Sequence, residues 1–411
     1  MTTDIIRLII FVSGLILIQG GIDYYLFRTL KKYEADYGSL ITDILKIYKS
    51  VSLLMLIMLI VTNAERLMTG SNYNSGRIPQ VLIAIWYLPK YPIALILSVK
   101  DIIRLFRYLI AKMRLKESTN ENAHIDYTRR KALHSITLGL ASVPFIATAQ
   151  GVLHTIYDVE VRKTEIVIPR LSSVFDGLKI VQISDIHTGS FFGVSYIEHV
   201  IEIIHQQSPG IIAITGDFVN FDPSEYERFV PLFRKLKATF GVFGSLGNHD
   251  HYMTNENHEY LISLIRKSGI DVLINESRTI EKLGASITIA GTDNTGFNQK
   301  YGDLKKAFKN APIDSPSILM AHDPTYWSME IKDSKLADLT LAGHTHGGQM
   351  GIEFLGTAFS PAQFVYEHWS GLYEENNTYL YVNRGLGTVG PPVRIGIKPE
   401  ITVITLRSPI A

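Results

Sequence analysis

Five short polar blocks constrain this chain more than any other feature, because each follows an apolar run typical of a β-strand. In chain order the blocks hold Asp185 and His187, then Asp217, then Asn248, His249 and Asp250, then His322, and last His344 and His346. Polar side chains at the carboxyl ends of strands meet at one edge of an α/β sheet. Carboxylate and imidazole groups bind divalent cations, and one carboxylate can bridge two of them. The blocks therefore predict an α/β domain with a hydrolytic site for two metal ions.

The segments between the blocks also favour an α/β fold. The expected strands are short apolar runs, namely Lys179–Ser184, Ile211–Thr215, Val242–Leu246, Ile318–Ala321 and Leu339–Ala342. Between them, 194–205 and 257–267 carry apolar residues at helical spacing. Because Asp185 and His187 are two residues apart just past a strand, a local turn must aim both at one metal ion.

The order of the blocks resembles the calcineurin-like metallophosphoesterase superfamily, whose pattern is D-x-H, G-D, G-N-H-D/E, a single H, and G-H-x-H. The resemblance covers residues 160–408. The runs 343–349 (GHTHGGQ) and 381–388 (YVNRGLGT) resemble its membrane-associated branch, which includes transmembrane proteins with a metallophosphoesterase domain and twin-arginine-exported bacterial phosphodiesterases. The resemblance implies a four-layer α/β/β/α sandwich, preceded here by an α-helical transmembrane region.

The resemblance also implies a role for each polar residue. The expected metal ligands are Asp185, His187 and His346 for the first cation, Asn248, His322 and His344 for the second, and Asp217 as the bridge between the two. Such oxygen and nitrogen donors fit Mn, Fe or Zn. We expect His249 to be catalytic, acting on the phosphoryl charge or the leaving oxygen, with Asp250 orienting its ring. The alternatives are a loop hydrogen bond for His249 and an Asx-turn or helix cap for Asp217.

The chain before residue 155 is unusually apolar, which raises the hydrophobic content of the whole sequence to 46%. We expect four membrane spans, at Leu8–Phe27, Ser50–Ala64, Ile78–Val99 and Leu133–Leu153. Pro89 and Pro92 predict a kink or a re-entrant segment in the third span, and 101–116 is expected to be an interfacial amphipathic helix. A cleaved signal peptide is the alternative for the first run. The expected domains are therefore a membrane region, 1–153, and a metallophosphoesterase domain, 154–411.

Basic residues suggest how the membrane region is oriented. Lys and Arg gather after the first span and before the last, so the positive-inside rule makes both loops cytoplasmic. This predicts a multi-pass protein of the cell (inner) membrane with an extracytoplasmic catalytic domain. Arg129 and Arg130 resemble a twin-arginine export signal, and an ordinary basic flank is the alternative; cleavage after Ala149 would release the domain.

Other features exclude several classes of function. A net charge of +1 gives no indication of nucleic acid binding, the absence of Cys excludes disulfides and thiolate ligands, and no protein partner is inferred. The G-x-G-x-x-G run at 385–390 is followed by Pro391 and Pro392, so no helix can begin there to bind a dinucleotide. Arg384 and Arg394 flank this run, and either a phosphate contact or a structural role is open to them.

These observations favour a membrane-anchored phosphoesterase that uses a metal-bridging hydroxide on phosphodiester or pyrophosphate bonds. Tethering at the bilayer favours a phospholipid or another lipid-linked substrate. Phosphoproteins are disfavoured because Asn220 and Phe221 stand where protein phosphatases of this superfamily carry Asp-Arg. One alternative is a UDP-2,3-diacylglucosamine pyrophosphatase-type activity in lipid A metabolism. The cytosolic enzymes of that step carry Asn-Arg-Asp where this chain has Asn248, His249 and Asp250. The expected topology, with the catalytic domain outside the cytoplasm, also opposes this activity. Further alternatives are a non-catalytic metal-binding scaffold and a regulated channel.

Overall fold

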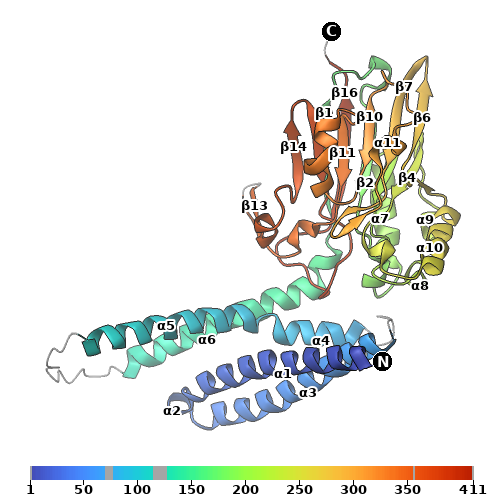
Figure 1. The fold of residues 1–411 in the computed structure, drawn as a ribbon. Coiled ribbons are helices and arrows are strands. Elements are labelled where there is room, and N and C mark those ends of the chain that lie inside the picture. Colours follow the sequence, from blue (N-terminus) through green and yellow to red (C-terminus); the bar gives the residue numbers. More distant parts are fainter. Residues whose placement is uncertain (1, 70–76, 114–126, 355–356, 410–411) are drawn as a thin grey trace. The chain divides into compact units, whose positions relative to one another are not determined.

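The computed structural model describes residues 2–69, 77–113, 127–354 and 357–409 (Figure 1). The chain divides into two compact units, Met1–Val152 and Leu153–Ala411, called here the helical unit and the C-terminal unit. Each unit has its own internal packing, as the change in sequence character near residue 155 leads one to expect.

The helical unit consists of α1 (Thr2–Lys31), α2 (Glu34–Tyr37), α3 (Ser39–Thr69), α4 (Arg77–Tyr87), α5 (Lys90–Met113) and α6 (Tyr127–Leu153). Within the described residues, three segments are long and apolar enough to span a membrane: Ser39–Ala64, Arg77–Met113 and Ser135–Tyr157. They contain the second and third expected spans and overlap all but the first two residues of the last one. The first expected span lies in α1, which is not among these segments, and the side chain of its first residue, Leu8, is outside the described residues.

Two features of the helical unit bear on the third expected span. The break expected there from the prolines is present, because α4 and α5 are separated at Leu88 and Pro89, and Pro92 lies in the first turn of α5, where proline is tolerated. The segment expected as an interfacial helix, 101–116, continues α5 without interruption as far as Met113, and its place at the membrane interface stays a prediction. The side chains of the twin arginines in α6 are outside the described residues.

A buried ion pair ties the helices of this unit together. The Nζ atom of Lys90 on α5 lies 2.5 Å from Oδ1 of Asp23 on α1, and Lys90 is 1% exposed. The rings of Trp86, Tyr48 and Tyr87 surround the ammonium group at 3.8, 4.8 and 4.9 Å from their centroids. Tyr48 also donates a hydrogen bond to Asp23. Residues of α1, α3, α4 and α5 therefore share one satisfied charge cluster.

The C-terminal unit is built on two six-stranded sheets, each with parallel and antiparallel pairs. The first has the order β1 (Glu160–Val167), β16 (Glu400–Arg407), β2 (Lys179–Ile183), β3 (Ile211–Thr215), β4 (Gly241–Ser245) and β5 (Asp271–Val272). The second has the order β14 (Gly371–Glu375), β15 (Thr378–Val382), β11 (Leu339–Ala342), β10 (Ser317–Met320), β7 (Ala285–Gly291) and β6 (Glu276–Lys282). Two small hairpins are β8 (Thr295–Gly296) with β9 (Gln299–Lys300), and β12 (Ile352–Phe354) with β13 (Thr357–Phe359).

Alternating side chains of the buried strands produce the layers. On β3, Ile211 packs in the core between the sheets, whereas Ile212 packs in the core under the helices. The helices of the first outer layer are α7 (Ser195–Gln206), α8 (Ser224–Glu227), α9 (Val230–Phe233) and α10 (Asn255–Lys267). On the far face of the second sheet, Leu319 of β10 packs with α11 (Leu304–Ala307) and Trp327, close to α12 (Lys332–Ser334). This arrangement confirms the expected fold of two mixed sheets between helices.

Candidate metal centre

All of the polar blocks follow strands whose carboxyl ends meet. In the first sheet β2, β3 and β4 run parallel and lead into Asp185, Asp217 and Asn248. In the second sheet β10 and β11 run parallel and lead into His322 and His344. The two sheets face each other across a shared core, so both sets of side chains reach the same place.

The backbone of the site is bent into an unusual conformation. The residues Asp185, His187, Asp217, His344 and His346 have φ values of 47°, 45°, 55°, 70° and 52°, in the left-handed region that non-glycine residues rarely adopt. Each such residue costs about 1–3 kcal/mol, and residues of this kind gather at functional sites. The left-handed turn at Asp185 and His187 lets two side chains two residues apart reach one group, as expected for the first block, whereas His344 and His346 of the last block reach different groups.

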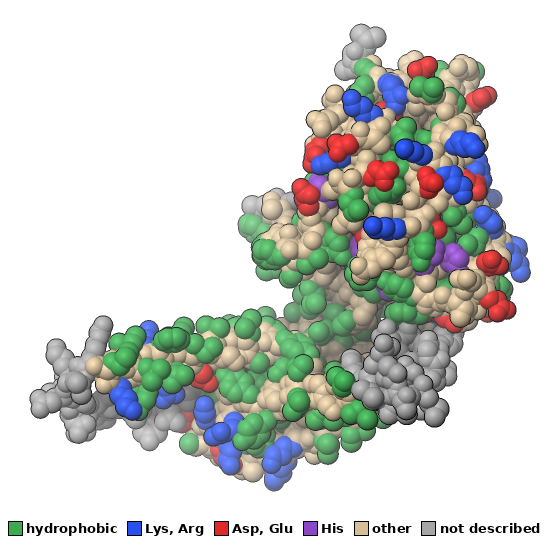
Figure 2. Space-filling view, viewed as in Figure 1, with side chains coloured by type: hydrophobic (Ala, Val, Ile, Leu, Met, Phe, Trp, Pro, Cys, Tyr) green, Lys and Arg blue, Asp and Glu red, His purple; other side chains and the backbone are tan. Residues whose placement is uncertain are grey.

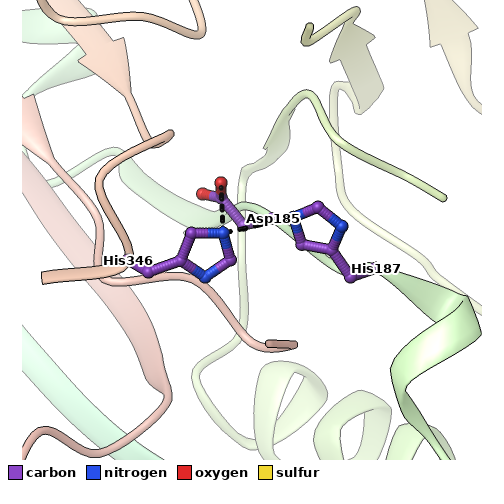
Figure 3. A group of neighbouring side chains, drawn as sticks. All are labelled: Asp185, His187 and His346. Carbon is purple, nitrogen blue, oxygen red and sulfur yellow. Dashed lines mark hydrogen bonds and ion pairs between the residues drawn. The ribbon is translucent and has the colours of Figure 1, made fainter. Parts of the chain in front are cut away.

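The first group of converging atoms comes from Asp185, His187 and His346 (Figure 3). Figure 3 shows the imidazole rings of the two histidines facing each other, with the carboxylate beside the His346 ring. Their Nε2 atoms are 3.1 Å apart, and Oδ1 of Asp185 lies 3.3 Å from Nε2 of His346. All three side chains are buried.

The second group joins Asp217, Asn248, His322 and His344. Nε2 of His322 lies 3.2 Å from Oδ2 of Asp217 and 3.2 Å from Oδ1 of Asn248. The same amide oxygen lies 2.8 Å from Nδ1 of His344. Oδ2 of Asp217 is also 3.5 Å from Nε2 of His187 in the first group. Asp217 therefore lies between the two groups, where a carboxylate can contact a cation in each.

The protonation states in the first group fit a cation. Burial lowers the pKa of His187 to about 3, and burial likewise holds the pKa of His346 well below its usual range, so both rings are neutral at pH 7. Burial raises the pKa of Asp185 to about 6. Nitrogen and oxygen lone pairs thus converge in a buried place, and a divalent cation satisfies them.

The adjacent carboxylate changes the pKa of one imidazole in the second group. Burial opposes the charge on His322, but the adjacent Asp217 raises the pKa of this imidazole to about 10. Burial lowers the pKa of His344 to about 4, so that ring is neutral. Metal binding requires an unprotonated ligand and would displace the proton from His322. The donors of this group therefore also fit a divalent cation.

The remaining nitrogens of these histidines are held by neighbouring groups. Nδ1 of His322 donates to the carbonyl oxygen of Thr215 at 2.7 Å. Nε2 of His344 lies 3.1 Å from the hydroxyl of Tyr366 and 3.5 Å from Oδ2 of Asp323. Such partners orient metal-binding imidazoles and raise their basicity. Neither Asp323 nor Tyr366 was expected from the sequence, although Asp323 directly follows the His322 block.

His249 faces the site, and a backbone carbonyl holds its ring. Its ring centroid is 4.7 Å from that of His187, its backbone N–H donates to Asp217 at 2.8 Å, and its Nδ1 atom lies 2.7 Å from the carbonyl oxygen of Asn220. With Nδ1 donating to Asn220, the Nε2 atom is the one available to other groups.

Asp250 does not orient that ring, so the expected contact is wrong. Its carboxylate oxygens instead accept backbone N–H groups of Asp217, Phe218 and Gly247, each at 2.9 Å. One buried carboxylate thereby joins the loops that follow β3 and β4. The contacts of Asp250 are therefore with the backbone of the loops that carry Asp217 and His249, not with the His249 ring.

The glycine-rich run after β15 packs directly on the first block. A Cβ atom at Gly385 would lie 2.7 Å from Cβ of Asp185, and one at Gly387 would lie 2.3 Å from the carbonyl oxygen of Ile186. The N–H of Gly387 donates to the carbonyl of Asp185 at 2.8 Å. The glycines therefore permit close approach of two loops at the metal centre, a role that the rejected dinucleotide motif did not reveal.

The two flanking arginines have structural partners. Arg394 is fully buried and donates to the backbone carbonyls of Arg384 and Gly387 at 2.9 and 2.7 Å. Arg384 donates to Glu353 at 2.7 Å. These contacts favour the structural alternative over a phosphate contact.

A cavity of about 240 Å³ opens beside the two groups. Asp217, Asn248, His249, His344 and His346 line it on the metal side, together with Phe297, Thr345, Gly348, Gln349, Tyr366 and Val389. Its walls thus combine the converging donors with aromatic and backbone surfaces.

Comparison with known proteins accounts for both units. Residues 6–155 match the family "Probable Calcineurin-like phosphoesterase, transmembrane domain", and residues 178–348 match "Calcineurin-like phosphoesterase". The uncharacterized metallophosphoesterase YkuE of Bacillus subtilis is 36% identical over 57% of this chain and 80% of its own. The uncharacterized metallophosphoesterase Cj0846 of Campylobacter jejuni is 26% identical over 97% of this chain and 98% of its own. The phosphodiesterase YaeI of Escherichia coli is 29% identical over 65% and 96%. With its matching motifs, fold and buried His and Asp cluster, the chain belongs to the calcineurin-like metallophosphoesterase family.

Proposed function

We propose that this protein is a membrane-anchored phosphoesterase that binds two divalent cations and hydrolyses phosphodiester or pyrophosphate bonds. The observation that carries the proposal is the position of Asp217, whose Oδ2 atom lies 3.5 Å from His187 in one group and 3.2 Å from His322 in the other. A carboxylate shared in this way is what two neighbouring cations need.

Each side chain of the centre has a place in this proposal. Asp185, His187 and His346 would hold one cation, Asn248, His322 and His344 the other, and Asp217 both. When bound, the cations supply an activated water and neutralise charge on the phosphoryl oxygens. The buried loops hold the donors in place before substrate arrives, so little reorganisation is needed during the reaction.

His249 is proposed to act on the substrate. Asn220 holds its Nδ1 atom, and the residue lines the cavity beside Asp217. Its Nε2 atom can then donate to a phosphoryl oxygen or pass a proton to the leaving oxygen. Asp250 is proposed as a positioning residue, because its carboxylate fixes the loops that carry Asp217 and His249.

The membrane region suggests the class of substrate. We propose that residues 1–153 form a multi-pass anchor in the cell (inner) membrane and that residues 154–411 form the catalytic domain outside the cytoplasm, as the basic loops predict. Phospholipids and lipid-linked pyrophosphates would then be presented close to the site.

The experiment is hydrolysis by the purified full-length protein in detergent, reloaded with Mn. Bis-p-nitrophenyl phosphate, p-nitrophenyl phosphate and UDP-2,3-diacylglucosamine are compared in parallel. We expect metal-dependent cleavage of the diester, lost in Asp217→Ala and kept in the matched control Asp333→Ala, which alters an exposed carboxylate on α12. Preference for UDP-2,3-diacylglucosamine would support the lipid A alternative. Bound metal without cleavage of any of the three would support a scaffold.

A further inference from the structure

The small hairpin of β12 and β13 exposes its apolar face. Ile352 pairs across the strands with Phe359, and Phe354 lies on the same face. The exposed fractions of these side chains are 70%, 53% and 72%. The segment that follows adds Phe364 and Val365, which are 77% and 74% exposed. We call these five residues the apolar hairpin face.

The hairpin is held in this orientation by its polar side. Glu353, between the two exposed residues of β12, accepts hydrogen bonds from Arg162 at 2.6 Å and from Arg384 at 2.7 Å. Ser360 donates to the carbonyl oxygen of Met350 at 2.8 Å. A soluble hairpin normally turns its apolar face inward, whereas this one turns a carboxylate inward and phenylalanines outward.

Figure 2 shows hydrophobic side chains gathered around β13, which Figure 1 labels on the left of this unit. A clustered, exposed apolar surface of this kind marks a site of interaction with a protein or a membrane. None of the five residues is charged, and no block of Lys or Arg lies within 350–366. The face is therefore suited to an apolar partner rather than to an acidic one.

The connectivity of the chain indicates which apolar partner lies within reach. The last candidate membrane span ends at Tyr157. Arg162, which holds Glu353, follows only five residues later on β1. Five extended residues cover at most about 18 Å, so the chain itself limits how far Arg162 can lie from the end of that candidate span. A short tether also gives the face a high effective concentration at the surface of the bilayer.

We propose that the apolar hairpin face inserts into the boundary between the headgroups and acyl chains of the bilayer that the helical unit spans. Phenylalanine and aliphatic side chains favour this boundary. Tyr366, which directly follows the face, places its hydroxyl 3.1 Å from His344 and lines the cavity. Docking would therefore hold the cavity next to the lipid headgroups. This inference concerns a membrane contact and does not depend on the proposed hydrolysis.

The native chain contains no Cys, so single cysteines can be labelled selectively. Phe354→Cys and Phe364→Cys test the face. Leu283→Cys and Ile313→Cys are matched controls, because these apolar residues are 87% and 91% exposed elsewhere in the C-terminal unit. Each full-length variant is labelled with the fluorophore NBD and reconstituted in phosphatidylcholine vesicles whose acyl chains carry a spin-label quencher. Metal content equal to that of the unaltered protein confirms that each variant is folded.

We expect quenching at positions 354 and 364 to be at least about threefold stronger than at 283 and 313, and to change little between low and high salt. Equal, weak quenching at all four positions would overturn the proposal. The proposal would also be overturned if the NBD fluorescence at position 354 changed with the number of protein molecules per vesicle and not with the quencher lipid. That result would indicate contact with a second copy of the protein. Because fluorescence is the readout, a protein without hydrolytic activity still gives a decisive answer.

Discussion

The helical unit and the metal centre both bury charged side chains, but they satisfy them in opposite ways. In the helical unit Lys90 is enclosed with its counter-ion Asp23 and three aromatic rings. In the metal centre two neutral imidazoles bring Nε2 atoms to 3.1 Å, beside a buried carboxylate. In a buried pair of opposite charges each group neutralises the other, so no further ligand is needed. Imidazole nitrogens and a carboxylate all offer lone pairs, so where they converge they need a cation between them and form a binding site.

The backbone shows the same contrast. The helical unit uses long regular helices, whereas five residues of the metal centre adopt left-handed φ values between 45° and 70°. Regular helices satisfy their own hydrogen bonds, which a membrane requires. The strained turns of the site persist because Asp250 and the glycine-rich run hold the loops around them.

The largest effect should follow from Asp217→Ala, because this carboxylate lies between the two groups. We expect bound Mn to fall below one ion per chain and hydrolysis of a diester to fall by about 10³-fold or more. Metal analysis and steady-state rates on the same preparation measure both. A variant that kept its metal and lost only activity would contradict the bridging role.

The counterpart in the helical unit is Lys90→Met, which leaves the buried Asp23 without its counter-ion and with only the hydrogen bond from Tyr48. We expect a loss of about 3–5 kcal/mol in the stability of that unit, measured as denaturation in detergent, with metal content unchanged. The double variant Lys90→Met with Asp23→Leu should recover most of the loss. Equal stability of the single variant and the original protein would mean that this pair is not structural.

His249→Ala separates catalysis from metal binding. Because Asn220 holds the ring and the residue lines the cavity, we expect kcat to fall by about 10²-fold while metal content stays the same. Steady-state kinetics with metal analysis tests this. If metal is lost as fully as in Asp217→Ala, His249 is a ligand.

A smaller effect is expected from Tyr366→Phe. The change removes a hydroxyl 3.1 Å from Nε2 of His344 and leaves the ring in place. Loss of such an outer contact weakens metal binding by about tenfold. Titration with Mn should show weaker binding of one cation and an almost normal kcat at saturation. Unchanged affinity would assign the orientation of His344 to Asp323 alone.

The fold of the C-terminal unit and many residues of its site could be predicted because each polar block directly follows a strand in the sequence. Each apolar run in the C-terminal unit is adjacent in sequence to the polar residue it positions, so Asp185, Asp217 and His344 could be placed at strand ends. Contacts between segments far apart in the chain could not be predicted, because no pattern in the sequence links the two partners. Tyr366 reaches His344 from a loop beyond the β12 and β13 hairpin, and Asp250 binds the backbone of a loop that follows another strand.

The central claim is that two cations share Asp217. The most direct test is to load the full-length protein with Mn, count the ions per chain and record its electron paramagnetic resonance spectrum. The account predicts two Mn ions per chain with a spin-coupled spectrum, and loss of the coupling in Asp217→Ala. One ion per chain, or two ions with uncoupled spectra, would contradict it.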